Sequence, residues 1–213
     1  WYTVAVRTGG PGAAGVSLLA IERDTPGFSR TELRKMGWWA SDTAELSFDD
    51  CRVPASNLIG AEGQAFPLIM RNFNGERLTL AASACGAAQA CLEDAVAWAR
   101  ERKTFGQSLI AHQVIRHKLV DMAERIEATR ALIDDLASRL DGGEQPVAQT
   151  AMAKNYAART MQFCADAAVQ ILGGSGYMRG VRVERIYREV KVMMIGGGAE
   201  EVLKDLAARQ LGF

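Results

Sequence analysis

The sequence predicts an α+β fold in which an antiparallel β region is followed by a four-helix bundle. In roughly the first 55 residues, apolar and polar side chains alternate, as they do in strands with one buried face. From about Gly63 the apolar period becomes about 3.6, and long segments follow one another with brief connections. We therefore expect a β part at 1–60 and a helical part at 61–213.

Turns rich in glycine and proline divide the β region into short strands. Trp1 to Thr8 alternates clearly, and Gly15 to Glu22 follows the next turn. Weaker strands are predicted at 28–35, 43–48 and 51–54. The chain starts in mid-strand and would leave an unpaired edge, so we expect an N-terminal portion of the same protein to precede it.

Five helices are predicted in the helical part. Their ranges are Asn74 or Glu76 to Arg102, His112 to Leu140, Gln145 to Leu172, Arg182 to Met193, and Ala199 to Gln210. The second has the cleanest pattern, with apolar residues in steps of three and four that only Thr129 interrupts. The first is rich in alanine, which allows neighbouring helices to approach closely.

Composition excludes several classes of protein. Lys plus Arg equals Asp plus Glu, 25 each, so no excess charge points to nucleic acid or an anionic membrane surface. The apolar runs are too short for a membrane span. Two histidines offer little for a metal site, and the four cysteines form no C-x-x-C pair. Reduced, buried thiols in a cytosol-like compartment are expected.

The segment Asn74-Gly75-Glu76-Arg77 carries the most unusual charges. Asn74 is expected to cap the first long helix, which would place the Glu76 carboxylate in the first turn, beside the positive helix end. Arg77 opposes the same dipole, and neither charge has an oppositely charged residue three or four positions on. Each is expected to face a group outside the helix; a capping glutamate beside a surface arginine is the alternative.

Two glycine-rich segments lie near the C-terminus. Gly173-Gly174-Ser175-Gly176 follows a helix and not a strand, which argues against a dinucleotide fingerprint and leaves a helix end or close approach to a flat ligand. Gly196-Gly197-Gly198 allows the backbone to lie against a ring or an acyl chain. Glu200 and Glu201 would repel a phosphate there.

The segment Glu101 to Gly106 has two interpretations. Its cations complement a helix C-terminus, which Gly106 would end. Alternatively Arg102, Thr104 and Phe105 could grip a phosphorylated aromatic cofactor.

Together these segments resemble the acyl-CoA dehydrogenases over essentially the whole chain. The motifs, in the family's order and spacing, are Met36-Gly37 with Ser41-Asp42-Thr43, Val53-Pro54, Asn57-Leu58-Ile59-Gly60, Arg102 to Gly106, His112-Gln113, Gln170 to Tyr177 and Arg188-Glu189-Val190-Lys191. Each motif alone is weak, but the ordered set is specific. The resemblance implies the C-terminal part of an antiparallel β-barrel domain and then the helical bundle, without the family's N-terminal helical domain.

The resemblance also implies an activity. Members bind FAD at a subunit interface of a dimer or dimer of dimers, convert a fatty acyl-CoA to a trans-2-enoyl-CoA, and pass electrons to an electron-transferring flavoprotein. The commonest members carry the catalytic base where this chain has Gly197. The isovaleryl and long-chain branches carry it at the front of the first long bundle helix, before an arginine, so the role falls to Glu76.

Other site residues carry over by the same resemblance. The FAD contacts are Arg102, Thr104, Phe105, Gln113, Gln170, Gly173 and Gly174, with Glu201 in place of a common glutamine. The substrate contacts are Ser41, Asn74, Arg77, Gly196 and Gly197, with Arg77 at the CoA end. Ala199 lacks a hydroxyl that the family offers to the flavin.

Several alternatives stay open at this point. An acyl-CoA oxidase using oxygen has the same fold, and a non-catalytic assembly subunit would explain the glycine at the usual base position. The three glycines are expected to widen one wall of the pocket, which suits a branched or longer acyl chain. A bacterial cytoplasm and a mitochondrial matrix fit the sequence equally.

Overall fold

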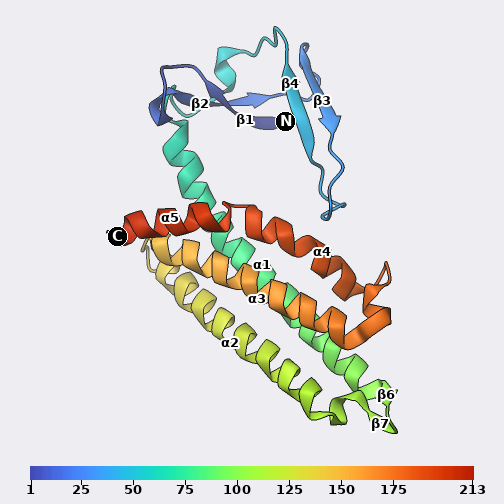
Figure 1. The fold of residues 1–213 in the computed structure, drawn as a ribbon. Helices are drawn as coiled ribbons and strands as arrows, with labels where there is room; N and C mark the ends of the chain where they lie inside the picture. The colour runs from blue at the N-terminus through green and yellow to red at the C-terminus, as the bar shows by residue number, and fades with distance from the viewer. The chain divides into compact units, whose positions relative to one another are not determined.

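The computed structural model describes residues 1–213 and divides them into two compact units, 1–73 and 74–213 (Figure 1). The boundary falls inside the first helix, α1, which spans Ala65–Glu101. No helix of the chain combines the length and the apolar character that a bilayer crossing requires.

The first unit contains two small antiparallel sheets. Strands β1 (Tyr2–Arg7), β2 (Val16–Ile21) and β5 (Leu58–Ile59) form one, in that order, and β3 (Phe28–Glu32) pairs with β4 (Ala44–Phe48) in the other. The antiparallel pairing follows the prediction. These strands do not show the barrel.

The strand predicted at 51–54 is wrong. That segment pairs with no strand, and a short 3-10 helix, Ala55–Asn57, follows it. Pro54 lacks an N–H donor for a sheet ladder and instead starts the 3-10 turn. Asn57 then joins the turn to β2 by donating from Nδ2 to the carbonyl of Ala20 at 2.9 Å.

The second unit is the helical bundle. It contains the remainder of α1, then α2 (Gln113–Asp141), α3 (Val147–Leu172), α4 (Arg182–Ile195) and α5 (Glu200–Leu211). A tight hairpin of β6 (Lys103–Thr104) and β7 (Gln107–Ser108) joins α1 to α2. Helix α3 packs against α2, α4 and α5 (Figure 1), and the predicted helices from α2 onward are confirmed to within one or two residues at each end.

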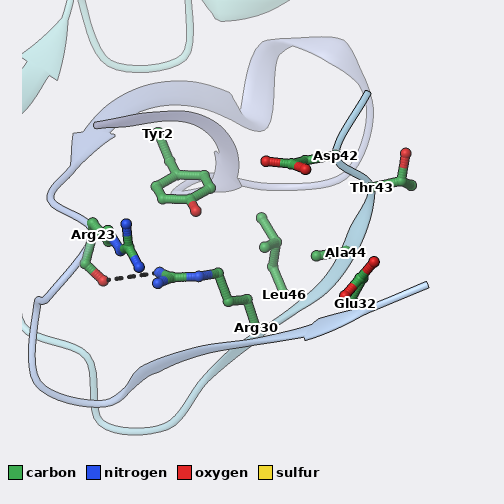
Figure 2. A pocket seen from close by; sticks show the side chains of 8 residues that line it. All are labelled: Tyr2, Arg23, Arg30, Glu32, Asp42, Thr43, Ala44 and Leu46. Carbon is green, nitrogen blue, oxygen red and sulfur yellow. Dashed lines mark hydrogen bonds between the residues drawn. The ribbon is translucent and has the colours of Figure 1, made fainter. Parts of the chain in front are cut away.

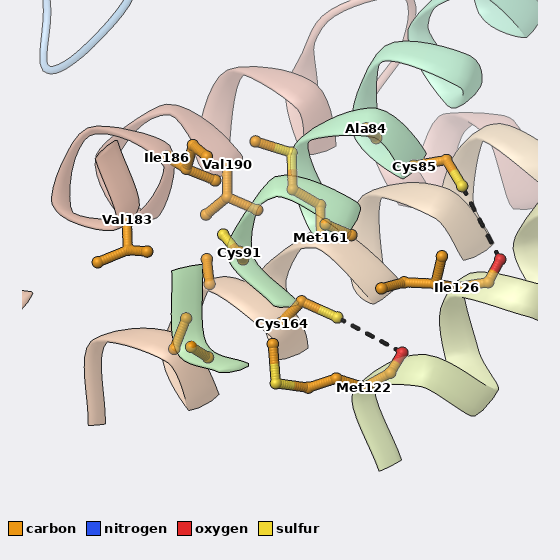
Figure 3. Packing of buried hydrophobic residues seen from close by; sticks show 14 of the residues in the cluster. Ala84, Cys85, Cys91, Met122, Ile126, Met161, Cys164, Val183, Ile186 and Val190 are labelled. Atoms are coloured by element: carbon orange, nitrogen blue, oxygen red, sulfur yellow. Dashed lines mark hydrogen bonds between the residues drawn. The ribbon is translucent and has the colours of Figure 1, made fainter. Parts of the chain in front are cut away.

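Small side chains line the bundle core, as the alanine-rich first helix predicts. The buried set on α1 includes Ala81, Ala84, Ala88, Cys91, Ala95 and Ala99, which meet Met161, Cys164 and Ala168 of α3 in one cluster (Figure 3). Three of the four cysteines are buried, and all four are free thiols. Burial raises the pKa of the Cys91 and Cys164 thiols to about 12, so both stay protonated at neutral pH.

Thr129, which interrupts the apolar pattern of α2, is fully buried and hydrogen-bonded. Its Oγ1 donates to the carbonyl of Arg125 at 2.7 Å and lies 2.9 Å from Oγ1 of Thr160 on α3. The donor of Thr129 is used within its own helix, so Thr160 supplies the proton of the second bond. The break in the pattern is therefore a polar link between two helices.

Candidate functional site

Asn74 is not a helix cap. Helix α1 begins at Ala65, so Asn74, Glu76 and Arg77 lie well inside it, and the helix dipole at its first turn does not act on them. The earlier start is compatible with Pro67, because a proline in the first turn of a helix has no hydrogen bond to lose. The Asn74 side chain instead accepts a hydrogen bond from Arg77.

Arg77 is buried and links α1 to the glycine segment before α5. Its side chain is 6% exposed. Nε donates to the carbonyl of Gly197 at 3.0 Å, and Nη1 donates to Oδ1 of Asn74 at 3.0 Å. Burial lowers the pKa of the Arg77 guanidinium, and the charge of Glu76 opposes that effect. Arg77 therefore does face a group outside its helix, as predicted, but it is not a surface arginine.

Gly197 and Gly198 form the tight turn between α4 and α5. Both have positive φ angles, +70° and +117°, which side chains other than glycine rarely adopt. A Cβ atom on Gly197 would lie 2.7 Å from Cδ1 of Leu80, on α1. Leu80 occupies the space beside Gly197, so glycine allows α1 to approach the turn closely; that the three glycines widen a pocket wall stays a prediction.

Lys154 of α3 holds the same turn from a second direction. It is 1% exposed, and its Nζ donates to the carbonyls of Met194 at 3.1 Å and Gly198 at 2.9 Å. Burial lowers the pKa of the Lys154 ammonium; Glu200 raises it and Arg77 lowers it further. Sequence reasoning missed Lys154, although a lysine among the apolar positions of α3 was a visible signal.

Glu200 fixes the start of α5. Its carboxylate pairs with Arg159 of α3 and lies 2.7 Å from Nζ of Lys204, and these bonds lower the pKa of Glu200 to about 2. The backbone carbonyl of Glu200 accepts a bond of 3.1 Å from Nδ2 of Asn155. Glu201, the predicted cofactor contact, is exposed in the same helical turn.

The predicted FAD contacts between α1 and α2 gather on the β6–β7 hairpin. Phe105 is 98% exposed and has a positive φ of 51°, a conformation that costs free energy for a residue with a side chain. The backbone N–H of Leu109 donates to the Arg102 carbonyl at 2.7 Å, and Thr104 Oγ1 lies 3.1 Å from His112 Nε2. This network holds an aromatic ring out in solvent.

Gln113 and Gln170 are exposed at helix ends. Gln113 is the first residue of α2, and Gln170 lies in the last turn of α3. Gly173 and Gly174 follow, and a Cβ added at either would meet no atom within 4 Å. Gln170 also lines a cavity of about 550 Å³ with Tyr177 and Arg188. The open backbone above the two glycines suits a flat ligand.

Ser41 belongs to the first unit, in the loop between β3 and β4. Its side chain is exposed, and its carbonyl accepts a hydrogen bond from Nζ of Lys35. The neighbouring residues Asp42 and Thr43 line an open cavity of about 520 Å³ (Figure 2). Arg23 and Arg30 face Glu32 and Asp42 across that cavity, so its charge favours neither anions nor cations.

The helical unit thus brings together one part of the predicted site. Asn74, Arg77 and Gly197 are joined by hydrogen bonds, and Glu76 stands next to Arg77 on an exposed position of α1. The hairpin contacts lie at the other end of α1, whose rise from Glu76 to Glu101 is about 38 Å at about 1.5 Å per residue. No cluster of three or more His, Cys, Asp or Glu side chains is placed to bind a metal ion.

Comparison with known proteins gives a consistent match. A family model described as the C-terminal domain of acyl-CoA dehydrogenase matches residues 63–212. The mitochondrial isobutyryl-CoA dehydrogenase of Dictyostelium discoideum is 40% identical over 215 residues, covering 99% of this chain and 51% of the relative. The crystal structure of a probable acyl-CoA dehydrogenase from Mycobacterium abscessus has a TM-score of 0.97 and 48% identity over 99% of this chain and 56% of its own.

A more distant solved structure, described as PigA with FAD and proline, has a TM-score of 0.93 at 25% identity and covers 99% of this chain and 55% of its own. The chain spans about half the length of the curated relatives that it matches.

Proposed function

Because the chain belongs to the acyl-CoA dehydrogenase family, we propose that it is the C-terminal part of an FAD-dependent enzyme that removes hydrogen from Cα and Cβ of an acyl-CoA thioester. The product would be a trans-2-enoyl-CoA. One observation carries the proposal for this chain's residues: the bond from buried Arg77 to the Gly197 carbonyl, which joins the α1 turn that bears Glu76 to the turn before α5.

We assign the catalytic base to Glu76. By the family resemblance, Gly197 stands at the usual position of the base and cannot accept a proton. Glu76 immediately precedes Arg77, which binds the Gly197 carbonyl. The α-proton of a thioester is weakly acidic, so its removal needs a carboxylate whose pKa approaches the operating pH. Glu76 is exposed in this chain. An acyl chain that covered it would remove water from the carboxylate and make it a stronger base.

The residues of the hairpin and of the α3 end fit FAD. An exposed aromatic ring, an arginine beside it, and glycine backbone open to a flat ring can contact the rings and phosphates of FAD. Phe105, Arg102, Thr104 and Gln113 would bind from the hairpin side, and Gln170, Gly173 and Gly174 from the α3 end. When bound, the flavin supplies the acceptor for the β-hydride.

The distance along α1 supports a homo-oligomer. The hairpin lies about 38 Å of helix away from Glu76. We propose that this separation is too long for Phe105 and Glu76 of one copy to contact the same cofactor. We infer that the hairpin of one subunit binds the FAD whose flavin serves Glu76 of another, in a dimer or a dimer of dimers.

The substrate and electron acceptor follow from the same assignment. We propose that Asn74, Arg77, Gly196 and Gly197 contact the acyl-CoA, together with Ser41 from the β part of the complete protein. Electrons would pass to an electron-transferring flavoprotein. We place the enzyme in a bacterial cytoplasm or a mitochondrial matrix.

The test is Glu76→Gln in the full-length, flavin-loaded protein. We expect the variant to keep its yellow FAD but to lose bleaching by acyl-CoA esters, because the amide cannot take the α-proton. Glu93→Gln is a matched control, since Glu93 is an exposed glutamate of the same helix that bonds only Gln89 among the contacts described. Unchanged bleaching in Glu76→Gln would refute the assignment.

Two other functions predict different outcomes. Steady turnover in air without a protein acceptor would indicate an acyl-CoA oxidase. A purified protein that binds no flavin would indicate the non-catalytic assembly subunit, which the glycine at position 197 favours.

A further inference from the structure

Lys154 is the largest fully buried side chain of the chain, and its placement at the glycine turn is not explained by packing alone. Burying an ammonium group costs free energy unless hydrogen bonds replace its water. Here two carbonyl oxygens replace it, at 3.1 Å from Met194 and 2.9 Å from Gly198. A methionine of similar length would fill the same volume without the free-energy cost of burying a charge. We therefore expect the ammonium group to have a role beyond filling space.

The two carbonyls bracket the turn. Met194 lies in the last turn of α4, where the backbone carbonyls of a helix have no intrahelical partner. Gly198 lies at the other end of the turn, one residue before the N-cap of α5. A cation at the negative end of α4 is electrostatically favoured. By bonding both carbonyls, one ammonium group fixes the span from the end of α4 to the start of α5.

Neighbouring contacts add to this fixation without replacing it. Arg77 binds the Gly197 carbonyl, which lies between the two that Lys154 binds. Asn155, the next residue of α3, binds the Glu200 carbonyl beyond the turn. The glycines have no side chains of their own to anchor the segment, and both central φ angles are positive. The conformation of the turn therefore depends on donors from α1 and α3.

We propose that Lys154 is a positioning residue, whose ammonium group holds the 196–198 turn at the distance from Glu76 that the reaction requires. The inference rests on the proposed function, because it takes this turn as the wall of the substrate site opposite the base. Without Lys154 the turn would keep its bond to Arg77 and the Asn155 bond beyond it but would lose both bonds to the α3 ammonium, so its position would be less fixed. Small displacements of a binding wall lower kcat strongly when they spoil the alignment of reacting atoms.

The test compares Lys154→Met with Thr160→Val in the full-length holoenzyme. Thr160 is equally buried on α3, but it bonds Thr129 of α2 and does not touch the turn. Hydrogen exchange would be followed at the amides of Gly196 and Leu203, which bond Val192 and Ala199 on either side of the turn. The second readout is kcat and KM with a series of acyl-CoA esters. Lys154→Gln, which keeps an amide donor, serves if the methionine variant does not fold.

We expect Lys154→Met to bind FAD and to show at least about tenfold faster exchange at Gly196, with kcat lowered about tenfold and KM changed less. Thr160→Val should lower Tm without either effect. Unchanged exchange at Gly196, or equal acceleration in Thr160→Val, would overturn the positioning role. Faster exchange with unchanged kcat would show that the turn does not position the reaction. If no acyl-CoA bleaches the wild-type flavin, the proposed function fails, whereas the exchange result still decides whether Lys154 fixes the turn.

Discussion

Gly197→Ala tests the close approach of α1 to the turn before α5. The substitution adds one methyl group at a residue with φ of +70°, where an L side chain costs about 1–2 kcal/mol. The new Cβ would lie 2.7 Å from Cδ1 of Leu80 and 3.7 Å from Cγ of Arg77. The contacted atom is the terminal methyl of half-buried Leu80, which can shift, so overpacking costs about 1 kcal/mol, the low end of its usual range. The two terms together predict that the free energy of unfolding falls by about 2–3 kcal/mol.

The assay is guanidinium unfolding of the flavin-free protein, followed by helical circular dichroism, so that FAD binding does not contribute to the measured stability. Gly174→Ala is the matched control, because a Cβ there meets no atom within 4 Å and φ is not positive; its effect should stay within about 0.5 kcal/mol. A double-mutant cycle with Leu80→Ala separates the two terms. Removing the Leu80 side chain should relieve the clash but not the backbone strain, which predicts a coupling energy of about 1 kcal/mol or more.

The result that would refute this reasoning is a Gly197→Ala variant as stable as Gly174→Ala. The Leu80 side chain would then shift without lowering the free energy of unfolding, and α1 would not be packed tightly on the turn. A large loss of stability with no coupling to Leu80→Ala would leave backbone strain as the sole cause.

Two further predictions concern single side chains. The pKa of Glu200 is lowered to about 2 by its bonds to Arg159 and Lys204, so the stability that these bonds contribute is present above the ordinary pKa of a glutamate and is lost as pH falls from about 4.5 to about 2. Arg159→Gln should therefore lower Tm at pH 7 by an amount that corresponds to less than about 1 kcal/mol, since Arg159 is half exposed. The difference in Tm between variant and wild type should shrink as the pH is lowered toward 2. A difference that grows in acid would contradict the assignment. Phe105→Ala should leave the free energy of unfolding within about 0.5 kcal/mol of the wild-type value, because the ring is 98% exposed. The variant should nevertheless bind FAD more weakly, by about 0.5–1.5 kcal/mol in titrations of the apoprotein. Unchanged FAD affinity would remove Phe105 from the cofactor site.

The sequence was informative where local pattern decides the structure. Helix α2 follows from its apolar steps of three and four, and its one polar interruption, Thr129, proved to be a buried link to Thr160. The predicted start of α1 was wrong because asparagine is a common helix cap. Nothing in the local sequence shows that Oδ1 of Asn74 accepts a hydrogen bond from Arg77, one turn further along the helix. Cap-forming side chains are ambiguous in this way, since the same atoms bond side chains within a helix.

The contacts that build the site could not be predicted, because they join residues far apart in the chain. Arg77 and Gly197 are separated by 120 positions, and Lys154 and Gly198 by 44. Each bond ends on a backbone carbonyl, which every residue possesses, so the sequence of the acceptor carries no signal. The donors do carry a signal in the sequence. An arginine or a lysine among small or apolar residues is expected to be buried and therefore to donate hydrogen bonds to oxygen atoms within the fold.

These contacts also bear on where a catalytic carboxylate can stand. A side chain at position 197 would meet Leu80, and a carboxylate there would be close to Arg77, which already binds the backbone of the same residue. With glycine at 197, Arg77 and Lys154 bond three carbonyls of the turn region. Glu76, by contrast, lies on a helix and is exposed to solvent, so an acyl chain could cover it as we propose. The tight turn and the proposed base at Glu76 are therefore compatible, since the glycine at 197 allows α1 to approach the turn through Arg77, the neighbour of Glu76.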